Sequence, residues 1–154
     1  MPNTYTNLLF HIVYGTKYRK PLIKAEWQDD LYGYMGGIIR DQKGVLLSAG
    51  GMADHVHLLA KLPPTIAVSD MLRLIKANSS KWAGERDDVP YFEWQEGYAA
   101  FSVSESQVDR VRDYVLHQEE HHRTMPFKQE YLGLLRKHKI EFDERYVFEE
   151  EHIG

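Results

Sequence analysis

The stretch D-H-V-H-L-L, residues 54–59, places two histidines one residue apart inside an apolar run. Side chains on a β-strand alternate between its two faces, so His55 and His57 are expected on one face. Val56 and Leu58 then point to the opposite face, where they can be covered by helices. The two imidazoles would lie roughly 6–7 Å apart on the other face of the sheet.

The surrounding sequence predicts the order β-α-β-β-α-β-α. The first six elements match an α+β, ferredoxin-like split βαβ fold, in which a four-stranded antiparallel sheet carries two helices on one face. In this topology the strand that contains the two histidines is central and pairs with the first strand. Strands are expected at 4–16, 44–49, 55–62 and 97–104, and helices at 27–39, from an N-cap at Ser69 to 82, from about 106, and briefly within 126–148.

Bulk composition predicts one compact domain over 1–148, followed by an acidic tail at 149–154. The chain has 154 residues, of which 43% are hydrophobic, and it contains no cysteine, so disulfides and thiolate metal sites are excluded. The sequence contains no apolar run long enough to cross a membrane, and its first ten residues lack a secretory signal pattern. A reduced, cytoplasmic setting is therefore expected.

The formal net charge of −4 argues at first sight against a nucleic-acid partner. However, residues 141–154 hold six acidic side chains and one basic side chain. Residues 1–140 therefore carry 18 basic and 17 acidic side chains, and this part of the chain is nearly neutral. A neutral body can still present a basic face, so the composition permits DNA binding without indicating it.

Two histidines on one strand can converge on a divalent cation, which would need a further ligand. Tyr114 and Gln118 are four residues apart and share one face of the expected third helix, with His121 close to the same stripe. If this helix covers the histidine face, the Gln118 amide oxygen can complete the site. The alternatives are two solvent-facing histidines and an ordinary surface stripe, and the spacing alone leaves them open.

Five blocks in order add a resemblance that covers about residues 5–148. They are HIVYGTKYRKPL (11–22), DHVHLLAKLPP (54–64), LIKANSSK (74–81), EGYAAFSVS (96–104) and VRDYVLHQEEHH (111–122). The chain resembles the HUH-type single-tyrosine transposases of short insertion sequences, including the relatives associated with repetitive extragenic palindromes (REP). In that family a histidine–hydrophobic–histidine motif, here 55–57, binds metal.

The resemblance implies that Tyr114 is the nucleophile and that His55, His57 and Gln118 bind Mg²⁺ or Mn²⁺. Such proteins cut single-stranded DNA beside imperfect hairpins, form a 5′-phosphotyrosine and rejoin the strands. They are typically homodimers, in which the tyrosine helix can serve the partner's metal site. Position 110 is arginine, so only one tyrosine nucleophile is expected on this helix, as in the transposases.

Supporting roles are less specific. Asp54 is either a turn residue or a partner that orients one of the histidines, and His121 or His117 is a candidate base for Tyr114. Two basic clusters are candidates for DNA contact, with a solvated charged face as the alternative. They comprise Lys17, Tyr18, Arg19 and Lys20, and then Arg73, Lys76 and Lys81 with Ser79 and Ser80.

Two other functions compete with transposition. The stretch HQEEH (117–121) has histidines at the i,i+4 spacing of zinc hydrolases, although glutamine stands where that motif has glutamate. A non-catalytic module that binds DNA hairpins is the second alternative. The chain keeps both histidines, the tyrosine and the glutamine, which argues against such a loss of activity.

Overall fold

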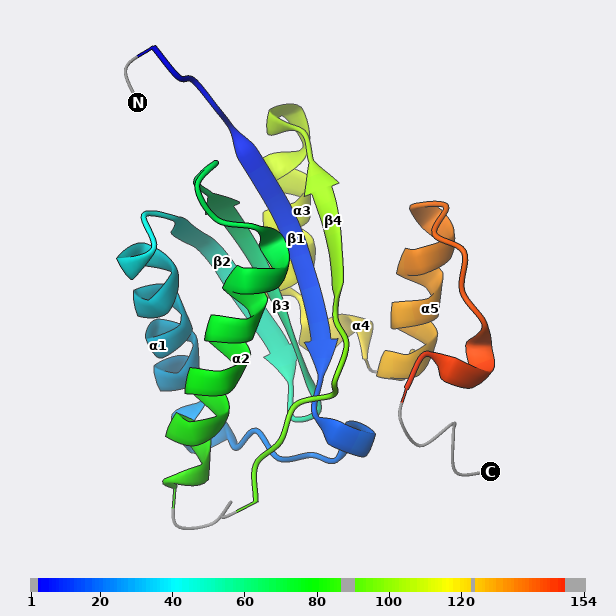
Figure 1. Cartoon of the computed structure of the whole chain (residues 1–154). Coiled ribbons are helices and arrows are strands. Elements are labelled where there is room, and N and C mark those ends of the chain that lie inside the picture. The colour runs from blue at the N-terminus through cyan, green and yellow to red at the C-terminus, as the bar shows by residue number, and fades with distance from the viewer. Residues whose placement is uncertain (1–2, 87–90, 123, 149–154) are drawn as a thin grey trace.

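The structure is a computed structural model, which describes residues 3–86, 91–122 and 124–148, and it confirms the α+β fold (Figure 1). The expected acidic tail, 149–154, lies outside the described residues. None of the described helices is both long and apolar enough to cross a membrane. The strands are β1 (Leu8–Gly15), β2 (Val45–Met52), β3 (His55–Leu62) and β4 (Ala99–Val103), and the longer helices are α1 (Gln28–Asp41), α2 (Val68–Gly84), α3 (Val108–Leu116), α4 (Gln118–His121) and α5 (Phe127–Lys137).

The four strands form one antiparallel sheet in the order β2-β3-β1-β4. The prediction that the histidine strand is central and pairs with the first strand is confirmed. In that pairing Val13 lies opposite His57, and Gly15 lies opposite His55. Both histidines therefore lie at the end of the sheet where β1 finishes and β3 begins.

One face of the sheet packs against α1 and α2, as the alternation of β3 predicts (Figure 1). Val56 and Leu58 are fully buried there, together with Leu31 of α1 and Ile75 of α2. Burial of such apolar side chains contributes about 1.5–3 kcal/mol each. This core therefore fixes which face of β3 is left for His55 and His57.

The opposite face, which we call the histidine face, is also covered. In Figure 1, α3 lies on the side of the sheet away from α1 and α2. Val13 and Phe101 of the sheet form a second core with Phe127 and Tyr131 of α5. The histidine face is therefore enclosed by the C-terminal part of the chain.

Gly50 of β2 lets α3 approach the sheet closely. A Cβ atom built at this position would lie 1.9 Å from the carbonyl oxygen of Val115, which belongs to the backbone and cannot rotate away. Because Tyr114 precedes Val115, the missing side chain at Gly50 sets how near the tyrosine comes to the histidine face. Close backbone approach is a common reason for glycine inside a strand.

Two details of the sequence-based prediction are wrong. Ser69 does not cap α2, because the carbonyl of Ala67 already accepts the first helical hydrogen bond, from the N–H of Met71, and the helix begins at Val68. The third helix is not continuous through 114–122. His117 leaves helical geometry with φ −106° and ψ 36°, and its Nδ1–H donates to the Asp113 carbonyl, in competition with the backbone.

Gly50→Ala should destabilise the protein by about 1–3 kcal/mol, because the added methyl forces α3 away from β2. Urea unfolding followed by circular dichroism measures the loss. Gly33→Ala is the matched control, since a Cβ there meets no atom within 4 Å. In the interior of α1 this control should stabilise by about 0.5–1 kcal/mol. Equal stability of the Gly50→Ala variant and the wild type would contradict the close-approach explanation.

Candidate metal and tyrosine site

The site is built around two fully buried histidines at the start of β3. The rings of His55 and His57 meet at 5.1 Å between centroids. Phe127 of α5 stacks on His55 at a centroid distance of 4.1 Å and an interplanar angle of 11°. The His57 ring lies 5.6 Å from the ring of Tyr114. Burial by α5 and α3 therefore places both imidazoles away from water.

His55 and His122 each have a hydrogen-bond partner at Nδ1, the ring nitrogen that points away from Gln118. His55 Nδ1 lies 2.7 Å from Asp54 Oδ1, and the Nδ1 of His122 bonds the carbonyl oxygen of Met125. Both of these oxygens only accept, so the Nδ1 of each ring is the donor. In the tautomer with a single proton, Nε2 is then a bare acceptor. Fixing the outer nitrogen in this way is how metal-binding histidines are oriented.

His57 is oriented by a third histidine, on β1. Its Nδ1 lies 2.8 Å from His11 Nε2, and the two rings are stacked. Burial lowers the pKa of His57 to about 4 and that of His11 to about 3, and it outweighs the opposite effect of the nearby Glu130 carboxylate. Both rings are therefore neutral at pH 7, and the tautomer in which His57 donates to His11 also leaves the His57 Nε2 bare.

The side chain of Gln118 faces the Nε2 atoms of His55 and His122. Its Nε2 donates to the Tyr114 backbone carbonyl at 3.0 Å, which turns its Oε1 toward the histidines. That oxygen lies 3.1 Å from the Nε2 of His55 and 3.1 Å from the Nε2 of His122. The side chain that sequence reasoning expected as third ligand is thus brought beside the histidine pair within one chain.

Glu130 of α5 completes the cluster. It is buried, and its Oε1 lies 3.1 Å from His57 Nε2, 2.9 Å from His122 Nε2 and 3.5 Å from His55 Nε2. Burial alone would raise the pKa of this carboxyl. The close imidazole of His57, and then the Tyr114 hydroxyl and His55, outweigh burial and lower the pKa of this carboxyl. Glu130 is therefore an ionised carboxylate.

Tyr114 is connected to the same carboxylate, because its hydroxyl donates to Glu130 Oε2. Burial raises the pKa of the Tyr114 phenol above its ordinary value, and the hydrogen bond and negative charge of Glu130 raise it further. The phenol therefore keeps its proton in this arrangement. A reaction at its oxygen needs that proton to move or a positive charge to arrive nearby.

The donor set fits a divalent cation. The bare nitrogens of His55 and His122 and the oxygens of Gln118 and Glu130 are acceptors facing one another, and they repel unless a cation or proton lies between them. Two ligands bound at about 2.1 Å to one cation lie about 3.0–3.4 Å apart, and the separations above are close to this range. Mixed imidazole nitrogen and oxygen donors are compatible with Mn²⁺ and Mg²⁺.

The other candidates from the sequence divide into near and distant residues. Asp54 contacts His55, and the His121 ring lies 4.5 Å from the Tyr114 ring. His117 is exposed and bonded to Asp113. Among the described residues, the acidic or histidine group close enough to hold a cation comprises His55, His122 and Glu130. The zinc-hydrolase alternative, through 117 and 121, therefore finds no support in the geometry.

The two basic clusters lie in different places. Residues 17–20 are separated from the end of β1 by Thr16 alone. Thr16 donates to the carbonyl of Asp54, which lies beside the site. The α2 cluster lies on the helix that covers the opposite face of the sheet. There Lys76 donates to the carbonyls of residues 95–97, and Arg73 pairs with Asp70. DNA contact by either cluster stays a prediction.

Sequence reasoning missed His11, His122 and Glu130. Strand alternation could have found His11, because it lies on the same face of β1 as Val13, the neighbour of His57. His122 ends the block that contains Tyr114, so its place in that block was a signal. No sequence signal pointed to Glu130, because its position in the site depends on how α5 packs against the sheet.

Comparison with known proteins places the chain in a family. The sequence profile of the family described as "Transposase IS200 like" matches residues 4–118. The transposase for insertion sequence element IS200 of Salmonella typhimurium is 27% identical over 124 residues, which are 77% of this chain and 81% of that protein. The ISDra2 transposase TnpA of Deinococcus radiodurans is 24% identical over 121 residues, covering 70% and 81%.

Solved structures agree on the fold. A crystal structure described as a candidate transposase from Deinococcus radiodurans R1 superposes with a TM-score of 0.60 at 22% identity, covering 75% of this chain and 93% of that chain. A REP-associated tyrosine transposase bound to a REP hairpin gives 0.54 at 17% identity, covering 75% and 68%. The family profile spans the histidine pair, Tyr114 and Gln118, and the chain belongs to the family of IS200-like transposases.

Proposed function

We propose that this chain is a metal-dependent transposase of single-stranded DNA in which Tyr114 forms a 5′-phosphotyrosine beside a DNA hairpin. The observation that carries the proposal is the shared carboxylate of Glu130. One of its oxygens faces the bare histidine nitrogens, and the other holds the Tyr114 hydroxyl. A nucleophile and a candidate cation site are thus joined through one side chain.

The reaction is a phosphoryl transfer that conserves the phosphodiester. The Tyr114 phenol oxygen attacks phosphorus, its O–H bond breaks, and a P–O bond to tyrosine forms. The bond to the 3′ oxygen of the upstream strand breaks, and that oxygen takes up a proton and leaves as a hydroxyl. Attack by another DNA 3′-hydroxyl reverses these changes, so strands are joined without an external energy source.

The chain's own residues provide the arrangement. We propose that His55, His57 and Gln118 hold Mg²⁺ or Mn²⁺. A cation held there would act as a Lewis acid on the phosphate oxygens and offset the negative charge that develops during transfer. Asp54 and His11 keep the two histidine rings in the binding orientation. Burial of the rings excludes competing water.

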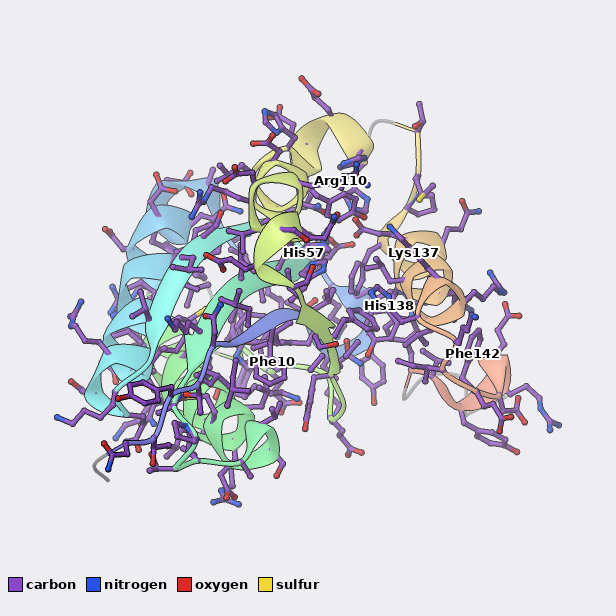
Figure 2. All side chains as sticks on the ribbon, turned by 90° about the horizontal axis from the view of Figure 1, so that it is seen from above. Phe10, His57, Arg110, Lys137, His138 and Phe142 are labelled. Atoms are coloured by element: carbon purple, nitrogen blue, oxygen red, sulfur yellow. The ribbon has the colours of Figure 1, made fainter. Side chains whose placement is uncertain are left out.

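A cavity beside Tyr114 offers a route for the DNA strand. It has a volume of about 540 Å³, and its wall includes Tyr114, His11, Arg110, Lys137 and His138. Figure 2 shows Arg110 on α3, Lys137 at the end of α5 and His138 directly after it around this region, with His57 nearby. Exposed cations next to the nucleophile suit the phosphates of a single strand. The REP hairpin bound to the solved relative supports a hairpin substrate.

Two further parts of the proposal are a second DNA contact, which rests on the sequence pattern of residues 17–20, and a homodimer, which rests on the family resemblance. Residues 17–20 lie at the same end of the sheet as His55 and are our candidates for an additional DNA contact. A homodimer is also proposed, although the histidines, Gln118 and Tyr114 already meet within one chain. The second candidate function is binding of DNA hairpins without cleavage, which the tests below distinguish.

Tyr114→Phe should abolish the covalent adduct and change hairpin affinity by less than about twofold, because only one hydroxyl is removed. Single-stranded oligonucleotides with an imperfect hairpin, incubated in Mn²⁺, are resolved on denaturing gels. A label at the 3′ end should become attached to wild-type protein, whereas a 5′ label should appear in a free fragment. Tyr34→Phe, an exposed tyrosine on α1, is the control. An adduct formed by Tyr114→Phe would remove Tyr114 as the nucleophile.

His57→Ala should reduce metal-dependent cleavage at least about 100-fold, since a cation ligand is lost. The measurement is the cleavage rate over a Mn²⁺ titration, compared with wild type before and after chelation by EDTA. Chelated wild type should be inactive and should recover when Mn²⁺ is restored. Wild-type cleavage that survives chelation, or unchanged cleavage by His57→Ala, would rule out this metal site.

Lys137→Ala should weaken binding of single-stranded DNA about 3–10-fold and make the slope of log affinity against log salt less steep by about 0.7, because one phosphate contact is lost. Fluorescence anisotropy at several salt concentrations provides both values. Lys43→Ala, in the exposed turn between α1 and β2, is the control and should match the wild type. An unchanged affinity and slope for Lys137→Ala would place the strand elsewhere.

A further inference from the structure

We propose that Glu130 is itself a ligand of the divalent cation through Oε1 and, through Oε2, the residue that positions the Tyr114 hydroxyl. This inference rests on the proposed function for the use of the cation and of Tyr114. It goes beyond it by adding a charged ligand from α5. The family profile ends at residue 118, so α5 lies outside the part of the chain that it matches.

The position of Oε1 is the first support. It lies within 3.5 Å of the Nε2 atoms of His55, His57 and His122, so one carboxylate oxygen faces three imidazoles. In the tautomer in which each ring carries its proton on Nδ1, these rings offer no hydrogen to the carboxylate. Tyr114 donates to Oε2 and not to Oε1, and an anionic oxygen buried without a donor is costly. A cation shared with the three nitrogens would remove that cost.

Charge is the second support. The other atoms that face the centre are imidazole nitrogens and the amide oxygen of Gln118, which can bind a cation but bring no negative charge. Neutral donors alone leave the full charge of a divalent ion in a buried site. Mg²⁺ and Mn²⁺ prefer oxygen ligands, and a carboxylate is the strongest oxygen donor a side chain provides. Glu130 therefore supplies what the histidines and Gln118 lack.

The rigid placement of α5 is the third support. Phe127 stacks on His55 and contacts the ring of Tyr131 at 5.5 Å between centroids. Tyr131 and Leu132 are buried in the second core beside Val13 and Phe101. Glu130 follows Phe127 by three residues, on a helix held against the histidine face. Its carboxylate is thus directed into the site by packing on the same helix.

The two oxygens of one carboxylate connect the cation to the nucleophile. A group that binds the cation through Oε1 holds its Oε2 at a fixed distance, and Tyr114 donates to that Oε2. The phenol oxygen is therefore oriented by the same residue that completes the metal site. Such positioning can contribute strongly to a transfer between two reactants.

Mn²⁺ binding to the full-length chain without DNA tests the ligand role. Glu130→Gln keeps the size of the side chain and removes its charge, and Glu130→Ala removes the ligand entirely. Glu120→Gln, on the exposed side of α4, is the matched control. Glu130→Gln should weaken Mn²⁺ affinity by about tenfold or more, measured by calorimetry and by electron paramagnetic resonance, with an altered spectrum of the bound ion. Glu120→Gln should bind as wild type does.

Adduct formation tests the positioning role. At saturating Mn²⁺, Glu130→Gln should lower the maximal rate of adduct formation at least about tenfold and leave the KM for hairpin DNA unchanged. Circular dichroism confirms that each variant is folded, and should Glu130→Ala not fold, the same-sized glutamine variant decides the question.

The two proposals fail separately. Wild-type affinity and an unchanged spectrum in Glu130→Gln would overturn the ligand assignment even where wild-type protein forms the DNA adduct. Loss of Mn²⁺ binding in Glu130→Gln, with no adduct from wild-type protein, would support the ligand assignment and reject the transposase mechanism. A raised KM with an unchanged maximal rate would reject the positioning role of Glu130.

Discussion

The burial of imidazoles whose bare nitrogens point at one another constrains the whole of the histidine face. A buried acceptor without a partner costs about 1–3 kcal/mol, and several acceptors in one place also repel. This cost falls on three histidines, because the Nδ1 of each is already bonded to another group. His55 is bonded to Asp54, His57 to His11, and His122 to the carbonyl of Met125. A cation at the centre would turn the repulsion into ligation, and metal binding would then be coupled to the stability of this region.

The helices α3 and α5 pack on the histidine face from two sides of the cluster. On one side, Gly50 lets α3 lie directly on β2, which brings Tyr114 and Gln118 over the histidines. On the other side, Phe127 of α5 stacks on His55 and fixes Glu130. Neither helix needs a strong intrinsic helix propensity, because each is held by burial against the sheet. The site geometry is therefore a property of packing across three segments distant in sequence.

Local sequence patterns were enough to predict the fold and to propose His55, His57, Tyr114 and Gln118 as neighbours in one site. The alternation in β3 fixed the face of the histidine pair, and the order of elements fixed β3 as a central strand, as observed. The i,i+4 spacing placed Gln118 near Tyr114 although the helix breaks between them at His117. Glu130 was beyond such rules, because no local pattern tells where a helix after a loop will dock. The missed cap at Ser69 has the same origin, since backbone geometry one residue earlier decided it.

The enclosed site also restricts how DNA can reach it. Phe127 and the β3 strand close the site around His55, whereas the cavity lined by Tyr114, Arg110 and Lys137 extends between α3 and α5. A phosphate in that cavity would meet exposed cations before it meets the nucleophile. In the proposed mechanism α5 would both complete the cation site and line the entrance, so cation binding and strand entry would depend on the same packed element.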